Sequence, residues 1–262
     1  MWIDTHCHLD AAEFAPDRDQ VVAAAHAAGV SRIIVPAVEL HGFAAVRDCC
    51  QRYAGCFPAY GIHPMYTPAA QESDLQALRE WLENERPLAV GEIGLDYFVP
   101  GLDRERQQFF FIEQLKLARE FNLPVLLHVR RAIDLVLKAL RQIRVPGGIA
   151  HAFNGSRQQA EVFIGLGFKL GFGGAMTWPR ATHLRELASG LPADSLVLET
   201  DAPDMSPVFL AVPPGGQPQR QRNAPEYLPR IAETLAHLRG ISLAEVATLN
   251  RRNAESVMPL LP

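Results

Sequence analysis

Short apolar runs rich in Val, Ile and Leu recur along the chain, and longer amphipathic segments lie between them. Such an alternation of buried strands and helices is typical of α/β proteins with a parallel sheet. The runs predict eight strands, at residues 2–5, 31–35, 57–60, 88–90, 125–128, 148–151, 168–171 and 196–200.

The segments between these runs predict helices. An Ala-rich segment at 17–28 precedes Gly29, a common residue just after a helix. A second helix follows Pro36 and extends to about residue 53, and a third has Ser73 as its expected N-cap. The longest spans 103–121, and a helix is expected after each of the last four strands.

Eight strands alternating with helices over 262 residues match a (β/α)8 TIM barrel. A doubly wound open sheet is the alternative, but no Gly-rich fingerprint follows the first strand. We therefore predict one barrel domain over residues 1–262, since no break in composition marks a linker. A Pro/Gly/Gln-rich stretch at 206–222 is expected to form a long loop inserted after the eighth strand.

The charge balance limits the partners. Lys and Arg total 25 against 29 for Asp and Glu, a net charge of −4, so a nucleic acid would have to be bound by a local cluster. The four cysteines lack CxxC spacing, which indicates neither a zinc knuckle nor a disulfide framework and favours the reducing cytoplasm. We expect no signal peptide and no membrane span, because no suitable apolar run occurs.

Five of the nine histidines follow or end a predicted strand: His6, His8, His63, His128 and His151. In a (β/α)8 barrel those strand ends form the catalytic face. His6 and His8 lie two residues apart, so their side chains share one face of the strand and can bind one metal together. Taken alone, such a pair is a weak signal, and a partly buried strand end is the competing interpretation.

Acidic residues complete the pattern. Glu92 directly follows the fourth predicted strand, and Glu199 and Asp201 end the eighth. A carboxylate can bridge two cations, and one acid of the pair can bind metal while the other supports a ligand or the attacking water. The predicted ligands are His6, His8, Glu92, His128, His151 and Asp201. Nitrogen and oxygen donors without thiolate suit Zn²⁺, Mn²⁺ or Mg²⁺, and two such ions are typical of hydrolases.

The chain resembles the TatD family of metal-dependent hydrolases, within the amidohydrolase-like barrels, and is most similar to its bacterial YjjV-type branch. The resemblance covers essentially the whole chain. It rests on I-D-T-H-C-H at 3–8, G-I-H-P at 61–64, G-E-I-G-L-D-Y at 91–97, R-E-R-Q-Q at 104–108, L-P-V-L-L-H at 123–128 and E-T-D-A-P at 199–203.

This resemblance implies that the six residues named above bind divalent metals and that His63 faces the substrate. Many members are described as Mg²⁺-dependent deoxyribonucleases with 3′→5′ exonuclease activity on single strands. The chain departs from the family at Phe98, at Asn154 and in the loop at 206–222. None of these departures affects a predicted ligand, so they concern substrate preference.

Lysine usage separates this chain from related barrels that bridge their metals with a carboxylated lysine. Only three lysines occur, and none ends a predicted strand: Lys116 and Lys138 are in helices, and Lys169 starts the seventh strand. Glu92 is therefore the predicted bridge between two divalent ions.

Three functions fit these features, and we favour a deoxyribonuclease of the 3′→5′ exonuclease type acting on single-stranded DNA or another phosphoester. Arginines that could meet phosphates fall in loops after strands or in the late loop, namely Arg130, Arg131, Arg157, Arg180, Arg220 and Arg222. A small-molecule ester or amide hydrolase is the alternative, slightly favoured by the negative charge. A metal-retaining scaffold without activity is disfavoured by the complete ligand set.

Roles can be assigned on this basis. Asp201 orients and deprotonates the attacking water, Glu92 bridges the metals, and His63 contacts a phosphate oxygen or the leaving group. Arg130 and Arg157 are the predicted substrate-binding cations. A monomer without an obligate protein partner is expected.

Overall fold

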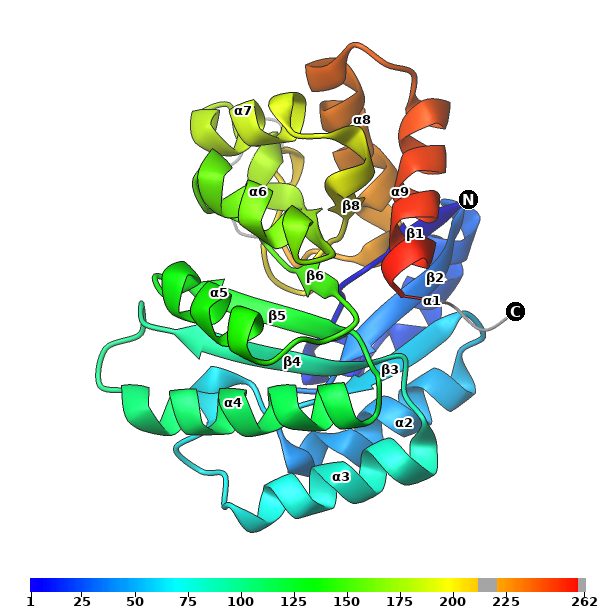
Figure 1. Ribbon diagram of the computed structural model, residues 1–262. Coiled ribbons are helices and arrows are strands. Elements are labelled where there is room, and N and C mark those ends of the chain that lie inside the picture. Colours follow the sequence, from blue (N-terminus) through cyan, green and yellow to red (C-terminus); the bar gives the residue numbers. More distant parts are fainter. Residues whose placement is uncertain (212–220, 259–262) are drawn as a thin grey trace.

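The computed structural model describes residues 1–211 and 221–258. Its strands form one parallel sheet in chain order (Figure 1). They are β1 (Trp2–Asp4), β2 (Val30–Pro36), β3 (Cys56–Tyr60), β4 (Ala89–Asp96), β5 (Val125–Arg130), β6 (Gly148–Ala150), β7 (Phe168–Phe172) and β8 (Leu196–Leu198). The first and last strands approach each other, because Thr5 N donates to Leu198 O and Cys7 pairs with Ala202. The sheet therefore nearly closes, and the predicted (β/α)8 barrel is confirmed.

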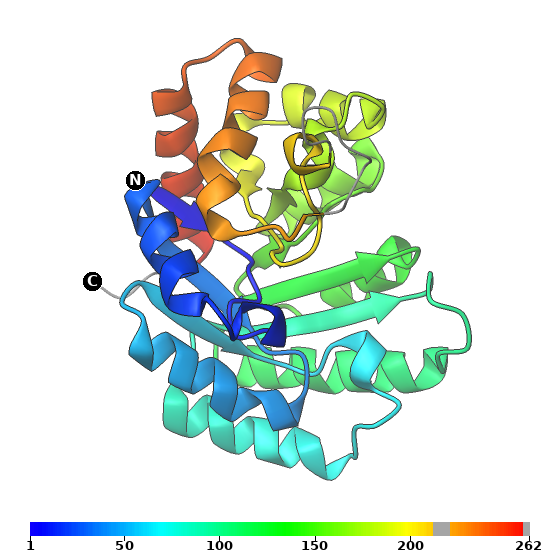
Figure 2. The ribbon, with the colours of Figure 1, turned by 180° about the vertical axis from the view of Figure 1, so that it is seen from behind.

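Helices cover the outside of the sheet in views from opposite sides (Figure 1, Figure 2). They are α1 (Arg18–Ala27), α2 (Phe43–Arg52), α3 (Ser73–Glu85), α4 (Arg104–Glu120), α5 (Ile133–Gln142), α6 (Arg157–Gly165), α7 (Thr182–Gly190), α8 (Leu228–Arg239) and α9 (Leu243–Val257). Within the described ranges, no helix combines the length and apolarity that a membrane crossing requires.

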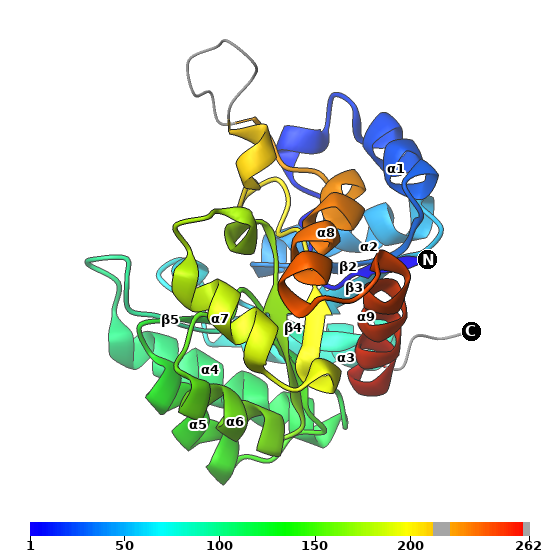
Figure 3. The same cartoon turned by 90° about the horizontal axis from the view of Figure 1, so that it is seen from above.

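Helix α9, which the sequence pattern did not predict separately, lies beside α8 and joins the two ends of the sheet (Figure 3). Its Asn250 accepts a hydrogen bond from Leu198 N and donates one to Ile3 O, both at 2.8 Å. The end of α9 also contributes Val257 and Met258 to the apolar cluster formed by the strand interiors. One end of the barrel is thus filled by side chains, so the functional site is expected at the other end.

Two local expectations were wrong. Ser73 is not an N-cap: Glu72 already has helical dihedral angles, so Ser73 lies inside the helix, and the Asp74 carboxylate accepts from Gln71 N instead. Strand β4 is longer than residues 88–90, because Ile93 to Asp96 pair with β5 after a shift in register. Glu92 therefore lies within β4, at that irregularity, and does not follow the strand.

The predicted loop at 206–222 falls partly outside the described residues. Its described beginning contains a short 3-10 turn at Val208–Leu210, and Arg222 at its end pairs with Asp17 at 2.6 Å.

Candidate metal centre

The predicted ligands meet at the end of the barrel where the strands terminate. Potential ligand atoms form three overlapping groups, and within each group they lie within 4.8 Å of one another. The groups are His6, Glu92 and His151; His6, His8 and Asp201; and His63, Glu92 and His128. The fold thus gathers all six predicted ligands and His63 at one place, from within or just after six different strands.

Glu92 lies at the centre of this arrangement, and its two oxygens face different imidazoles. Its Oε2 is 3.2 Å from His6 Nε2 and 3.6 Å from His8 Nε2. The distances from Oε1 are 3.1 Å to His128 Nδ1 and 3.6 Å to both His63 Nε2 and His151 Nε2. This division is what a carboxylate that bridges two cations requires.

Most of the imidazoles are held in orientation by their second ring nitrogen. His8 Nδ1 lies 3.2 Å from Pro36 O, and His128 Nε2 lies 3.0 Å from Asp96 Oδ2. His151 Nδ1 is 3.1 Å from Glu199 Oε1. Each of these partners accepts a hydrogen bond from the imidazole, so in the neutral ring the nitrogen that faces the centre keeps its lone pair, as a metal ligand needs.

His63 has the opposite arrangement. Its Nδ1 accepts a hydrogen bond from Met65 N at 3.2 Å, so the ring proton of the neutral imidazole is on Nε2, which faces Glu92. Burial lowers the pKa of His63 to about 3, which keeps the ring neutral. His63 was expected to face the substrate. It lies near enough to Glu92 and His128 to complete a ligand group, but its tautomer presents a donor there.

The donor set fits divalent cations. His6 Nε2 and His8 Nε2 lie 3.3 Å apart, and Asp201 Oδ1 is 3.7 Å from both. The hydrogen bond to Pro36 O leaves His8 Nε2 with a lone pair. His8 Nε2 and Asp201 Oδ1 are then both acceptors, and the single Nε2 of His6 cannot donate a proton to each of them. Acceptors that converge in a buried or partly buried site need a proton or a cation to be stable, and nitrogen and oxygen donors suit Zn²⁺, Mn²⁺ or Mg²⁺.

The pKa shifts follow from the same geometry. Although burial opposes protonation, the charges of Asp201 and Glu199 raise the pKa of His151 to about 10. Burial likewise opposes protonation of His128, but its bonds to Asp96 and Glu92 raise its pKa. Protons on these two rings neutralise the acids when no cation does so, and binding of metal therefore releases protons.

Asp96 was not among the predicted site residues, because the apolar run of the fourth strand ends before it in the sequence. Its carboxylate is buried, contacts His128 and accepts hydrogen bonds from Phe98 N and Val99 N at 2.8 and 3.1 Å. Burial would raise the pKa of Asp96, but these bonds lower it to about 2. The available signal was spacing, since Asp96 lies four residues after Glu92 in an alternating strand.

The predicted substrate arginines differ in position. Arg130 ends β5, 3.7 Å from Asp96, with its guanidinium carbon 4.0 Å from the centre of the Phe98 ring. Arg157 donates to Gly190 O at 3.1 Å, at the end of α7. Arg220 lies outside the described residues.

The lysines also lie where the sequence placed them. Lys169 Nζ donates to Asp194 O just before β8 begins, and Lys116 pairs with Glu113 on α4. Lys138 lies within α5.

Known proteins of one family are similar to this chain over nearly its whole length. The family model described as TatD related DNase matches residues 3–259. The uncharacterized metal-dependent hydrolase YjjV of Escherichia coli (strain K12) is 42% identical over 249 residues, which cover 94% of this chain and 93% of that protein. The crystal structure of YjjV superposes with a TM-score of 0.92 at 40% identity, covering 99% of this chain and 98% of that one.

A further relative is the 3'-5' ssDNA/RNA exonuclease TatD of Escherichia coli (strain K12), which is 31% identical over 257 residues. The match covers 97% of each chain. The present chain belongs to the TatD family of metal-dependent hydrolases.

Proposed function

We propose that the protein is a phosphodiesterase that uses two divalent ions to remove nucleotides from the 3′ end of single-stranded DNA. One observation carries this proposal: the two carboxylate oxygens of Glu92 face two separate sets of imidazoles. The name of the relative TatD, a 3'-5' ssDNA/RNA exonuclease, supports the choice of substrate.

The metal ligands in this proposal are His6, His8, Glu92, His128, His151 and Asp201. Two divalent ions held there would supply Lewis acidity, lowering the pKa of water and neutralising charge on a phosphate. Mg²⁺, Mn²⁺ and Zn²⁺ are all compatible with donors of this type.

The chain's own residues supply the remaining chemistry. The Asp201 side chain is 15% exposed, against 2% for Glu92, so it is the acid best placed to reach an attacking water and accept its proton. His63 Nε2–H donates to a phosphoryl oxygen or to the leaving group, because its Nδ1 is engaged by Met65 N. Arg130 lies at the same end of the barrel, where its charge can meet a phosphate.

A small-molecule ester, amide or phosphoester hydrolase remains the second candidate. The net charge of −4 favours it, as does the engagement of two predicted arginines: Arg222 pairs with Asp17 and Arg157 bonds Gly190. Few cations are thus available for a long polyanion.

The deciding experiment is an activity panel after chelation, with each divalent cation added back separately. The substrates are single-stranded DNA and RNA labelled at the 5′ end, phosphomonoesters, and nitrophenyl esters and anilides. We expect a ladder of products shortened from the 3′ end, with an affinity for strands that falls steeply as salt rises. Cleavage of the small substrates alone, with no cation supporting strand cleavage, would establish the second candidate instead.

The proposal places the enzyme in the reducing cytoplasm as a monomer. Its four cysteines are all unpaired, which favours a reducing compartment. Size-exclusion chromatography with light scattering tests the monomer, and a dimer mass would contradict it.

A further inference from the structure

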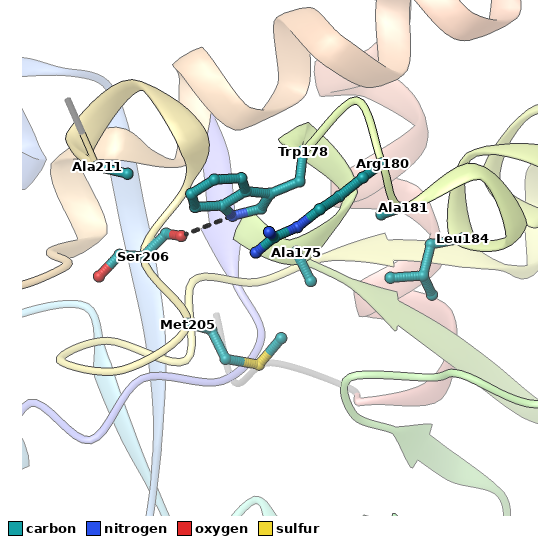
Figure 4. A pocket seen from close by; sticks show the side chains of 8 residues that line it. All are labelled: Ala175, Trp178, Arg180, Ala181, Leu184, Met205, Ser206 and Ala211. Carbon is teal, nitrogen blue, oxygen red and sulfur yellow. Dashed lines mark hydrogen bonds between the residues drawn. The ribbon is translucent and has the colours of Figure 1, made fainter. Parts of the chain in front are cut away.

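A cavity of about 840 Å³ lies between the segment that follows β7 and the segment that follows β8 (Figure 4). Its walls include Ala175, Trp178, Arg180, Leu184 and Met205. Both segments follow strand ends, so the cavity belongs to the same end of the barrel as the metal centre. Its volume falls in the usual range for small-ligand sites, about 300–1,000 Å³.

The cavity is close to the proposed base along the chain. Met205 comes four residues after Asp201, and Asp204 N donates to Asp201 O at 2.9 Å in the turn between them. Four residues of even fully extended chain span at most about 14 Å. A ligand in the cavity therefore lies near any group that is positioned at Asp201.

Trp178 and Arg180 form a stacked pair in this cavity. The guanidinium carbon of Arg180 lies 4.8 Å from the centre of the Trp178 ring. The indole is held in place because its Nε1–H donates to Ser206 O at 3.2 Å (Figure 4). Arg180 is exposed and, within residues 1–211 and 221–258, enters no ion pair, so its charge is not neutralised by an acid there.

The chemistry of the walls selects a planar ring. The indole N–H and the Ser206 carbonyl already satisfy each other, and Leu184, Met205 and the alanines are apolar. The cavity presents an aromatic face, a guanidinium plane and a polarisable thioether. These groups stack on the face of a ring and form no hydrogen bonds to the polar atoms at its edge. Any nucleobase presents such a face, and stacking on aromatic and Arg planes is how single strands are bound without sequence preference.

We propose that this cavity binds a base of the single strand, one nucleotide or a few away from the bond being cleaved, and that Arg180 meets the adjoining phosphate. The proposal rests on the function proposed above and assigns the substrate contact that holds the strand. It predicts stacking on Trp178 without discrimination between bases.

Binding of two short fluorescent strands tests it, one of oligo-dT and one of equal length with abasic sugars. Anisotropy is measured on the metal-loaded Asp201→Asn protein, in which cleavage is slowed. We expect oligo-dT to bind more tightly than the abasic strand, and Trp178→Ala to weaken oligo-dT roughly tenfold while leaving the abasic strand unchanged. Trp178→Phe should keep most of the preference, because it retains an aromatic face.

Phe109→Ala is the matched control, since Phe109 is an exposed aromatic side chain on α4, and it should change neither affinity. Arg180→Gln should weaken both strands by a similar factor and reduce the salt dependence. Equal weakening of both strands by Trp178→Ala, or none, would overturn the base site.

Cleavage assays with the wild-type protein distinguish a failure of the base site from a failure of the proposed exonuclease function. If the wild type cleaves strands but Trp178→Ala keeps the preference for oligo-dT, the base site is wrong and the function stands. If the wild type cleaves neither strand and the preference still depends on Trp178, the function is wrong and the cavity remains a base site.

Discussion

Glu199 Oε1 lies 3.1 Å from His151 Nδ1, and both side chains are buried. The same oxygen also accepts from Ala152 N at 2.6 Å, which fixes the carboxylate against the turn that follows β6. Space for it exists because Gly171 has no side chain: a Cβ there would lie 2.1 Å from Glu199 Oε2. By engaging Nδ1, Glu199 thus determines that His151 faces Glu92 with Nε2.

Glu199→Gln is expected to weaken metal binding by about 10- to 100-fold, the usual effect of losing a partner of a metal-bound imidazole. The amide keeps the shape, but its NH₂ can donate to Nδ1 and move the ring proton to the nitrogen that faces the centre. Titration against a competing chelator measures the affinity, and the midpoint of unfolding tests the fold. Glu186→Gln, on the exposed side of α7, is the control. Equal affinities would show that Glu199 has no such role.

Glu92→Ala is expected to lose at least one of two bound ions and nearly all activity. Removing this carboxylate takes away the one group whose oxygens face both sets of imidazoles. Metal analysis of the dialysed protein gives the stoichiometry, with Glu105→Ala at the exposed start of α4 as the control. A variant with unchanged stoichiometry and turnover would disprove the bridge.

His63→Ala is expected to lower turnover by about 100-fold or more, the usual scale for losing a hydrogen-bond donor to developing charge, with metal content intact. The reason is its tautomer, because Met65 N donates to Nδ1 and leaves the proton on Nε2. Turnover per bound metal is the measurement. Loss of metal from a folded variant would instead make His63 a ligand in the group that it forms with Glu92 and His128.

The gathering of the ligands was predictable because barrel geometry brings all strand ends to one face, whatever their separation along the chain. The residues that contact those ligands were harder to predict from the sequence. Asp96 was missed because Gly91 and Gly94 interrupt the apolar run, whereas β4 continues through them: Gly94 has φ 150°, and its missing side chain leaves room for the backbone of His128. That continuation depends on pairing with β5, which no local pattern shows.

The cavity could not be predicted from the sequence for the same reason. Trp178 and Met205 are far apart in sequence, and they face each other only because β7 and β8 are adjacent in the sheet. Arg157 shows the opposite outcome, since a loop position suggested a phosphate contact but its guanidinium bonds Gly190. A position at the end of a strand therefore predicts well where the strand's last side chains lie. It predicts less well the contacts of long side chains farther along the loop.

Asp4 provides a test of pH dependence. Burial raises the pKa of Asp4 from 3.8 to about 7, although hydrogen bonds from Thr200 oppose this change. A carboxyl whose pKa is higher in the folded state favours folding below its unfolded pKa, and this contribution is lost as the pH rises through the folded value. The wild type should therefore lose stability relative to Asp4→Asn between about pH 4 and pH 8. The loss should be a few kcal/mol at most, because each tenfold difference in proton affinity between the folded and unfolded states corresponds to about 1.4 kcal/mol.

Denaturant unfolding of the chelated proteins across this window gives the difference. Asn keeps an oxygen for the hydrogen bond from Thr200 N, at 2.9 Å, without ionising. Asp48→Asn, at an exposed position of α2, is the control and should give a profile parallel to that of the wild type. Parallel profiles for Asp4→Asn would show that Asp4 does not ionise differently in the folded protein.

Asp201→Asn is expected to lower turnover by at least about 100-fold, the scale of general-base catalysis, and to reduce metal content much less than Glu92→Ala does. The amide keeps one oxygen toward His6 and His8, each 3.7 Å from Oδ1, but it cannot accept the proton of the water. A divalent ion would lower the pKa of a bound water toward about 7, so a carboxylate would suffice as its base. Turnover per bound metal is followed against pH, and near-full turnover with an unchanged acidic limb would place the base elsewhere. Glu199 is then a poor substitute, because it is fully buried and its Oε1 is engaged by His151 and Ala152.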